Sequence, residues 1–289
     1  MQRRRLKAFD ALREFVGDQP EFSDEDAIPR AWRQFNEAIG LPMLPSTNLP
    51  HRLLSYQDDA GSYKGKDLIV NKANKIGMTE AILRDLAFKG TVGDCVGYQM
   101  MLGAQRREMA FENMRRLQHI FDGSAILRPL VKEKKQSRLI LSNDTEYLVM
   151  PRSPAAMRGW PRLKYAFLDE AAHYGLLDDQ EFLAATTSRL SNTDGYLRVV
   201  STPKGQRGFF WQQCMAAQQD PQSPFAYRQW DFHVALGVMV TEEFIAKERA
   251  RLGTLFSQEY ECAFLSAQNA AIEQELIQKS LVDKEPEPW

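Results

Sequence analysis

The stretch "VNKANKIGMTEAIL", residues 70–83, decides the fold that this sequence predicts. It starts at the end of an apolar strand, passes a Gly-x-Thr step and continues with a helical pattern. A phosphate-binding loop has this order and the pattern G-x-x-x-x-G-K-[ST], in which backbone amides cradle the phosphates, the lysine neutralises their charge and the hydroxyl ligates Mg²⁺. When Gly77 and Thr79 are aligned with that pattern, Met78 occupies the lysine position. The stretch predicts either a nucleotide site whose lysine lies elsewhere or an ordinary turn that caps a helix.

Two nearby lysines are candidates for the missing charge. Lys72 stands where the loop would have its first glycine, and Lys75 lies midway along it. A flexible lysine side chain from the start of the loop would still reach the phosphates, because the placement of the charge matters and not its origin in the chain. Lys72 is the favoured candidate and Lys75 the alternative.

A second candidate element is "LKYAFLDEAAH", residues 163–173. Its apolar strand ends in two adjacent carboxylates, Asp169 and Glu170. A magnesium-dependent nucleotide hydrolase needs such a pair, with one acid holding Mg²⁺ through water and the other taking a proton from the attacking water. Two solvated acids at the end of a strand are the alternative for the pair taken alone.

A third element is "LRVVSTPKGQRGFF", residues 197–210, in which an apolar strand ends in Ser201, Thr202 and Pro203. Polar groups at the carboxyl ends of parallel strands face the ligand crevice. An ordinary exit from a strand into a turn is the alternative. The loop, the acid pair and this segment follow one another in the order that a nucleotide-hydrolysing site requires, and their conjunction is more specific than any one of them.

The elements between these motifs predict an α/β fold. Short apolar runs at 67–71, 96–102, 139–141, 147–150, 165–168, 197–201 and 226–230 are typical of strands, and helical patterns cover 80–89, 105–121, 179–190 and 208–217. Such alternation predicts a mostly parallel sheet flanked by helices. A hairpin in "LILSNDTEYLVM", with its turn at Asn143 and Asp144, adds an antiparallel piece.

Three segments are predicted along the chain. Residues 1–47 form a helical N-terminal segment that ends in a proline-rich connector, and residues 48–240 form the sheet-containing core. Residues 241–289 form a helical C-terminal subregion, whose first helix starts near Thr241, and end in a linker stub, "DKEPEPW".

Composition excludes little but sets the setting. The net charge is −1, although residues 103–138 carry nine lysines and arginines against four acids. This basic segment is a candidate nucleic-acid surface, and a solvated helix face is the alternative. Three cysteines without metal-ligand spacing indicate a reduced, cytoplasmic setting. The basic N-terminus lacks a signal peptide's apolar core, and no apolar run reaches membrane-spanning length.

Together, these motifs resemble the ATPase portion of the large terminase subunit of tailed bacteriophages and related viruses, over about residues 48–280. The resemblance implies a P-loop NTPase of the type with an additional catalytic glutamate, using ATP and Mg²⁺. It implies adenine contact by Gln57 in "LLSYQDD", and an arginine finger at Arg158 in "SPAAMRGW" that acts on a neighbouring subunit's nucleotide; an exposed loop arginine is the alternative for Arg158. The other implied residues are Lys72, Lys75, Gly77, Met78 and Thr79 for the nucleotide, Thr79 and Asp169 for the metal, Lys72 and Glu170 for catalysis, and Ser201, Thr202 and Pro203 for coupling hydrolysis to movement.

The same resemblance implies partners and a location. It implies a motor that translocates double-stranded DNA without sequence readout, as a homo-oligomeric ring on a portal protein together with a small terminase subunit, in the cytoplasm of the host of a virus or prophage. About 20 residues follow the last recognisable segment, so we expect the family's nuclease domain to be absent here, and a separate chain is one source for it.

Two other functions are consistent with the motifs. One is another nucleic-acid-dependent P-loop ATPase such as a helicase, although a helicase would need a second motor domain. The other is a nucleotide-binding assembly protein or prophage remnant with weak or no ATPase activity, which Met78 and the missing nuclease favour slightly.

Overall fold

The computed structural model describes residue 12 and residues 27–43, 50–63, 65, 67–150, 159–174 and 179–266. The predicted arginine finger, Arg158, lies outside the described residues, as do most of the predicted N-terminal segment and the predicted linker stub.

Eight strands of the described chain form one sheet in the order β3-β4-β5-β2-β6-β7-β1-β8. The strands β1, β2, β5, β6, β7 and β8 pair in parallel, whereas β3 and β4 run antiparallel at one edge. The mostly parallel sheet that the sequence predicted is therefore confirmed. The bounds are β1 Asp67–Lys72, β2 Gln99–Ala104, β3 Val131–Lys135, β4 Arg138–Leu141, β5 Glu146–Val149, β6 Leu163–Asp169, β7 Tyr196–Ser201 and β8 Ala226–Trp230.

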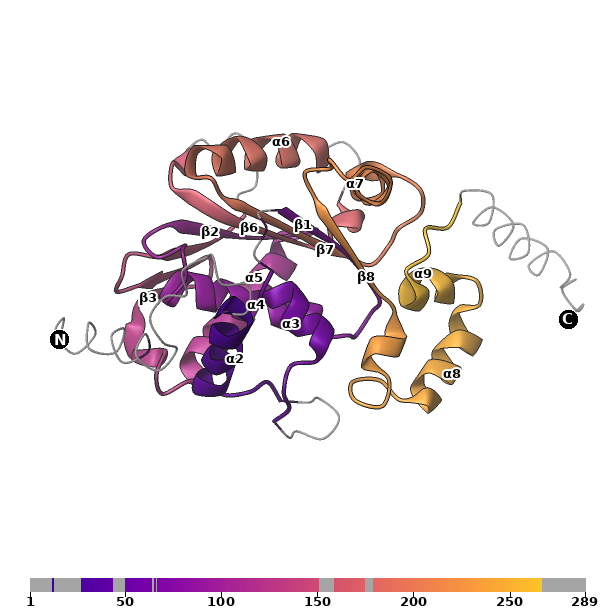
Figure 1. Ribbon diagram of the computed structural model, residues 1–289, viewed down its shortest axis with the longest axis horizontal. Coiled ribbons are helices and arrows are strands. Elements are labelled where there is room, and N and C mark those ends of the chain that lie inside the picture. The colour runs from indigo at the N-terminus through magenta and orange to yellow at the C-terminus, as the bar shows by residue number, and fades with distance from the viewer. Residues whose placement is uncertain are drawn as a thin grey trace, which may run out of the picture.

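Helices cover both faces of this sheet, as Figure 1 shows. On one face lie α2 (Ala27–Ile39), α3 (Ser55–Gly61), α4 (Met78–Thr91) and α5 (Arg107–Gly123), and on the other α6 (Asp179–Leu190) and α7 (Gly208–Gln219). Each face has its own cluster of buried apolar side chains. Strands covered on both sides read as continuous apolar runs, which is why β1, β2, β6 and β7 were visible in the sequence.

The order of the strands brings three motifs to one edge of the sheet. Strand β7 lies between β1 and β6 and pairs with both in parallel. Parallel neighbours end at the same edge, so the loop after β1, the acids after β6 and the segment after β7 meet there. This arrangement positions the candidate site.

The hairpin with a turn at Asn143 and Asp144 is confirmed. Strands β4 and β5 pair antiparallel, and Asp144 takes the left-handed backbone conformation (φ 63°) that a tight turn requires. Strand β3, which precedes it, was not predicted. The basic segment 103–138 therefore belongs to α5, to a short 3₁₀ turn (Arg128–Leu130) and to β3, and the interpretation of it as one solvated helix face is wrong.

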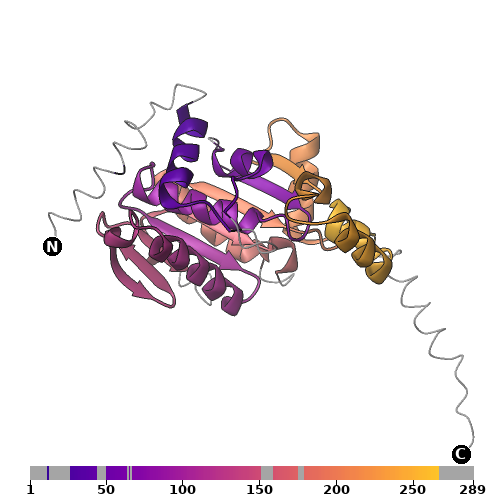
Figure 2. The ribbon, with the colours of Figure 1, turned by 90° about the horizontal axis from the view of Figure 1, so that it is seen from below.

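The described chain is helical after β8. It forms a 3₁₀ turn (Phe232–Ala235), α8 (Glu242–Leu252) and α9 (Leu255–Glu261), which lie beyond the β8 edge of the sheet (Figure 2). Helix α8 starts as predicted, because the Thr241 hydroxyl accepts a hydrogen bond of 3.2 Å from the amide of Phe244. Phe256 stacks on Tyr260 with ring centroids 5.1 Å apart and holds α9 together. We call residues 231–266 the C-terminal helical unit.

The cysteines are buried and free, as their spacing predicted. None of the helices in the described ranges is long and apolar enough to span a bilayer.

Candidate nucleotide-binding site

The loop between β1 and α4 has the tight backbone of an anion-binding turn. Gly77 precedes the first helical residue with φ 72°, a conformation that favours glycine. A Cβ at this position would lie 2.6 Å from Nε2 of Gln57 and 2.6 Å from Cε of Met239. Lys75 also has a positive φ, 61°. The loop therefore approaches its surroundings more closely than a side chain at Gly77 would allow, and the amides of α4 face the space in front of it.

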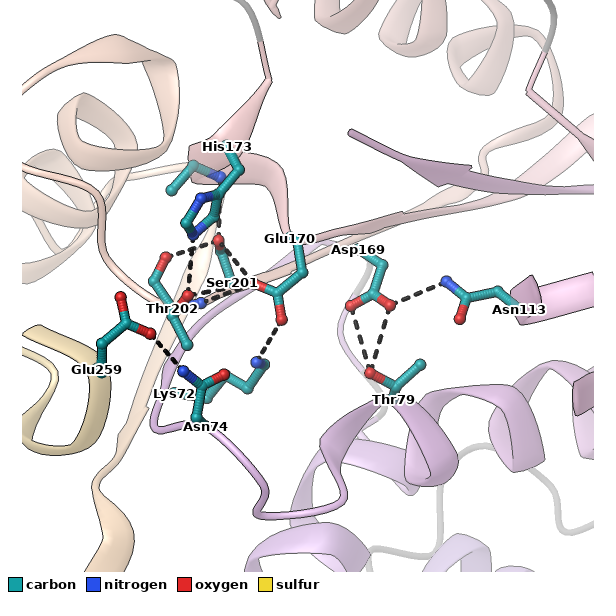
Figure 3. Close-up of polar contacts among 11 residues, drawn as sticks. Lys72, Asn74, Thr79, Asn113, Asp169, Glu170, His173, Ser201, Thr202 and Glu259 are labelled. Carbon is teal, nitrogen blue, oxygen red and sulfur yellow. Dashed lines mark hydrogen bonds and ion pairs between the residues drawn. The ribbon is translucent and has the colours of Figure 1, made fainter. Parts of the chain in front are cut away.

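Lys72, at the end of β1, reaches the acid pair. Its side chain is 5% exposed, and its Nζ donates to Oε1 of Glu170 at 2.6 Å (Figure 3). A buried ammonium needs such a partner, because burying an unpaired charge is costly. The lysine that the sequence favoured therefore lies beside the catalytic glutamate candidate.

The other two loop candidates point elsewhere. The Nζ of Lys75 lies 4.3 Å from the ring centroid of Phe244, on α8. Met78 is 1% exposed and belongs to the apolar cluster on its side of the sheet. The position that the usual pattern gives to lysine is thus a core position in this chain.

Asp169 and Thr79 lie together at the start of α4. The Thr79 hydroxyl is 3.3 and 3.4 Å from the two carboxylate oxygens of Asp169, and Nδ2 of Asn113 donates to Oδ2 at 2.9 Å. Burial first, and then the neighbouring charge of Glu170, raise the pKa of Asp169 to about 6. A hydroxyl and a carboxylate are hard oxygen donors of the kind that Mg²⁺ prefers. The residues predicted for the metal fit that ion.

Glu170 is held through both carboxylate oxygens. Its Oε1 accepts from Lys72, and its Oε2 accepts from the amide of Thr202 at 3.2 Å and from the Thr202 hydroxyl at 3.3 Å. Burial by itself would raise the pKa of Glu170, but the charge and hydrogen bond of Lys72 and the Thr202 amide outweigh it and leave the pKa lowered. Ser201, next to Thr202, is fully buried, and its hydroxyl accepts from the amide of Ala172 at 3.0 Å. The coupling segment thus contacts the acid pair directly.

Gln57 faces the phosphate loop. Its Oε1 accepts from the amide of Leu54 at 2.9 Å, and its Nε2 lies 3.3 and 3.2 Å from the carbonyl oxygens of Ile76 and Gly77. The residue is 1% exposed. Its amide therefore supports the loop backbone, and the adenine contact that the resemblance implied stays a prediction.

A cavity of about 860 Å³ opens in front of these groups. This volume is within the range of small-molecule and cofactor sites. The C-terminal helical unit and the N-terminal connector complete its walls. The lining residues are Pro42, Met43, His51, Gln57, Lys72, Asn74, Lys75, Ile76, Gly77, Met78, Thr79, Glu80, Arg116, Glu170, Met239, Val240, Thr241 and Phe244.

Comparison with known proteins places this geometry in a fold family. No protein-family model and no curated protein matches the sequence. Among solved structures, the large terminase ATPase domain of Thermus phage P74-26 matches with a TM-score of 0.61 at 20% identity, over 80% of this chain and 98% of that one. The chain has the fold of a large terminase ATPase domain.

Two longer terminases agree with this match. The large terminase of bacteriophage HK97 matches with a TM-score of 0.65 at 18% identity over 79% of this chain, and that of a thermophilic bacteriophage with 0.62 at 12% over 74%. The chain spans 53% and 54% of their lengths. The resemblance that the sequence motifs carried is therefore confirmed at the level of the terminase ATPase fold.

Sequence reasoning missed two side chains of this terminase-like site. Asn113 on α5 supports Asp169, as described above. His173, three residues after Glu170, has its Nε2 3.0 Å from the Thr202 hydroxyl. Since that hydroxyl donates to Glu170, it accepts from His173. The histidine stands in the quoted motif "LDEAAH", so its position so close to the acid pair was the available signal; Asn113 gave none.

Proposed function

We propose that this chain is the ATP-hydrolysing motor domain of a viral DNA-packaging terminase and that it translocates double-stranded DNA. One observation carries the proposal: Lys72, the acid pair and Thr202 meet at one sheet edge, beside a cavity large enough for a nucleotide, in a chain with the terminase ATPase fold. The large terminase of the thermophilic bacteriophage has been solved with ADP and with ATP-gamma-S, in structures that this chain matches with TM-scores of 0.59 and 0.56.

In this function the loop residues bind the triphosphate. The backbone amides at the start of α4 accept the phosphates, as helix N-termini do. Lys72 neutralises charge near the transferred phosphate, and Thr79 and Asp169 hold Mg²⁺, which would neutralise the charge that develops on the phosphate oxygens. Gln57 supports the loop, in addition to the adenine contact proposed for it.

Glu170 is the group that activates water. Its lowered pKa keeps it ionised at neutral pH, so it is able to accept a proton. In the nucleotide-free protein Oε1 is occupied by Lys72. When the Lys72 ammonium turns to a phosphate, Oε1 becomes available to water while Thr202 keeps Oε2 in place. Glu170 is therefore positioned and released by residues from two neighbouring strand ends.

The remaining parts of the proposal concern movement. Ser201, Thr202 and Pro203 would transmit the change at Glu170 to the rest of the chain, and Arg158 would act on a neighbouring subunit's nucleotide. The motor would work as a ring on a portal protein with a small terminase subunit and a nuclease from another chain, in the host cytoplasm. It would contact the DNA backbone without reading the bases, because a motor must move over any sequence.

The experiment is steady-state ATP hydrolysis with and without duplex DNA. We expect hydrolysis by the wild type, stimulation by DNA of any sequence, and loss of turnover in Lys72→Ala and Glu170→Gln with nucleotide binding retained in Glu170→Gln. If the wild type binds ATP but neither DNA nor Glu170→Gln changes hydrolysis, the motor function is wrong. Binding without turnover would instead favour an assembly protein with a degenerate site.

A further inference from the structure

The cavity wall has one cation that the proposed chemistry does not use. Arg116 lies on α5, one helical turn after Asn113, and lines the cavity together with Thr79 and Glu80. Its side chain is 37% exposed, so its guanidinium is accessible from the cavity. The charge of Arg116 also reaches Asp169, where it counts among the groups that lower the pKa, although burial and Glu170 outweigh it. Arg116 thus lies between the metal site and the open cavity.

Arg116 shares its counter-charge with another arginine. Glu80 gives Oε1 to Nε of Arg84 at 2.9 Å and Oε2 to a terminal nitrogen of Arg116 at 3.4 Å. Arg84 is 6% exposed and also donates to Oδ1 of Asn36 at 3.1 Å and to the carbonyl of Gly40 at 2.8 Å, so it is fixed in place. One carboxylate cannot neutralise two guanidinium groups. The wall beside Thr79 therefore carries excess positive charge, and Arg116 has the longer and more exposed contact.

A triphosphate needs more positive charge than the loop of this chain supplies. Met78 is a core residue, Lys75 lies on Phe244, and Lys72 is the only loop lysine directed at the acid pair within the described residues. A guanidinium presents a planar fork of donors that matches phosphate oxygens, and such charge-assisted contacts are strong.

We propose that Arg116 binds the phosphate chain of the nucleotide from within the same subunit, as a second cation beside Lys72 that replaces the charge missing at Met78. The assignment rests on the proposed nucleotide function. It predicts that the Arg116 guanidinium exchanges its long contact with Glu80 for phosphate oxygens, while Arg84 keeps Glu80 in place. Arg116 would then contribute to affinity in proportion to the number of phosphates.

The neighbouring Arg115 is a matched control. It lies on the same helix and carries the same charge, but its side chain is 59% exposed and forms an ion pair of 2.5 Å with Glu112 away from the cavity. Replacing either arginine by alanine removes one positive charge from α5. A difference between the two variants therefore reports position and not net charge.

The test is equilibrium binding of adenosine, AMP, ADP and ATP-gamma-S in the presence of Mg²⁺, measured by calorimetry on the full chain. We expect Arg116→Ala to weaken binding of ATP-gamma-S on the order of tenfold, as loss of a charged hydrogen bond implies. The loss should shrink through ADP and AMP and vanish for adenosine. Arg115→Ala should bind all four like the wild type, and Arg116→Lys should recover part of the loss.

Two results would overturn the assignment. If Arg116→Ala binds ATP-gamma-S as tightly as the wild type does, or loses as much affinity for adenosine, then Arg116 does not bind phosphate. The same holds if Arg115→Ala weakens binding equally, because the effect would then be one of net charge. If the wild type itself binds none of the nucleotides, the proposed function fails, and this result is distinct from the other two.

Discussion

Lys72 and Glu170 form a 2.6 Å ion pair that joins the end of β1 to the end of β6 across β7. The lysine side chain is 5% exposed and that of the glutamate 21%. Each charge is therefore the main compensation for the burial of the other. The two residues that the proposed function assigns to phosphate and water neutralise one another in the nucleotide-free protein, and nucleotide binding must separate them.

Removing one partner of this pair should destabilise the protein more than removing both. Lys72→Met leaves the Glu170 carboxylate buried with only Thr202 as a partner, and breaking a buried pair in this way costs about 3 kcal/mol. In Lys72→Met/Glu170→Gln no charge is left unpaired, so most of that loss should return. Denaturant unfolding of the three proteins measures the difference. Equal stabilities for the single and double variants would show that the pair is not formed in solution.

Asn113 should set the magnesium requirement. Its amide is 5% exposed and donates to Asp169 at 2.9 Å, which orients the carboxylate toward Thr79. Loss of such an outer partner commonly weakens metal binding, and we expect Asn113→Ala to need about tenfold more Mg²⁺ for half-maximal hydrolysis. A titration of Mg²⁺ at saturating ATP measures this. Gln118→Ala, on the exposed part of the same helix, is the control, and an unchanged requirement in Asn113→Ala would remove its assigned role.

The catalytic edge could be predicted because its residues follow buried parallel strands. The strands before Lys72, Asp169 and Ser201 are apolar runs, and parallel strands end at a common edge, so their exits had to meet. The sequence could not give the pairing of Lys72 with Glu170, because it depends on β7 lying between β1 and β6 and on the conformations of two long side chains.

Asn113 and β3 show the limits of pattern reading. Asn113 lies on α5 among other polar residues, and helical periodicity does not say which of them faces an acid from another strand. Strand β3 has the sequence "VKEKK", and it pairs only with β4 at the edge of the sheet. An edge strand with charged side chains has no apolar alternation to identify it, and lysines are common there because they block edge-to-edge pairing.

Gln57 should matter for the loop. Gln57→Ala removes the donor that serves the carbonyls of Ile76 and Gly77, and loss of such hydrogen bonds costs about 1 kcal/mol in unfolding free energy. Denaturant unfolding tests this part. The ratio of ATP to GTP affinity tests the adenine contact separately: a fall in that ratio in Gln57→Ala would support the contact, and an unchanged ratio would limit Gln57 to the loop.

His173 should make stability depend on pH through Thr202. Burial lowers its pKa below the ordinary value, since the surrounding charges of Glu170, Lys204, Glu259 and Lys72 do not compensate for lost solvation. The unfolded chain therefore binds the proton first as the pH falls, so the stability contributed by neutral His173 is present above about pH 6.5 and is lost below it.

Replacing His173 by glutamine should remove this dependence. The glutamine amide keeps a donor for the Thr202 hydroxyl but does not titrate, so His173→Gln should resemble the wild type at pH 8 and exceed its stability at pH 5.5. His233→Gln, at an exposed histidine paired with Asp231, serves as the comparison. Denaturant unfolding between pH 5.5 and 8 measures the slopes. A wild type and a His173→Gln variant that lose stability in parallel would place the sensitive group elsewhere.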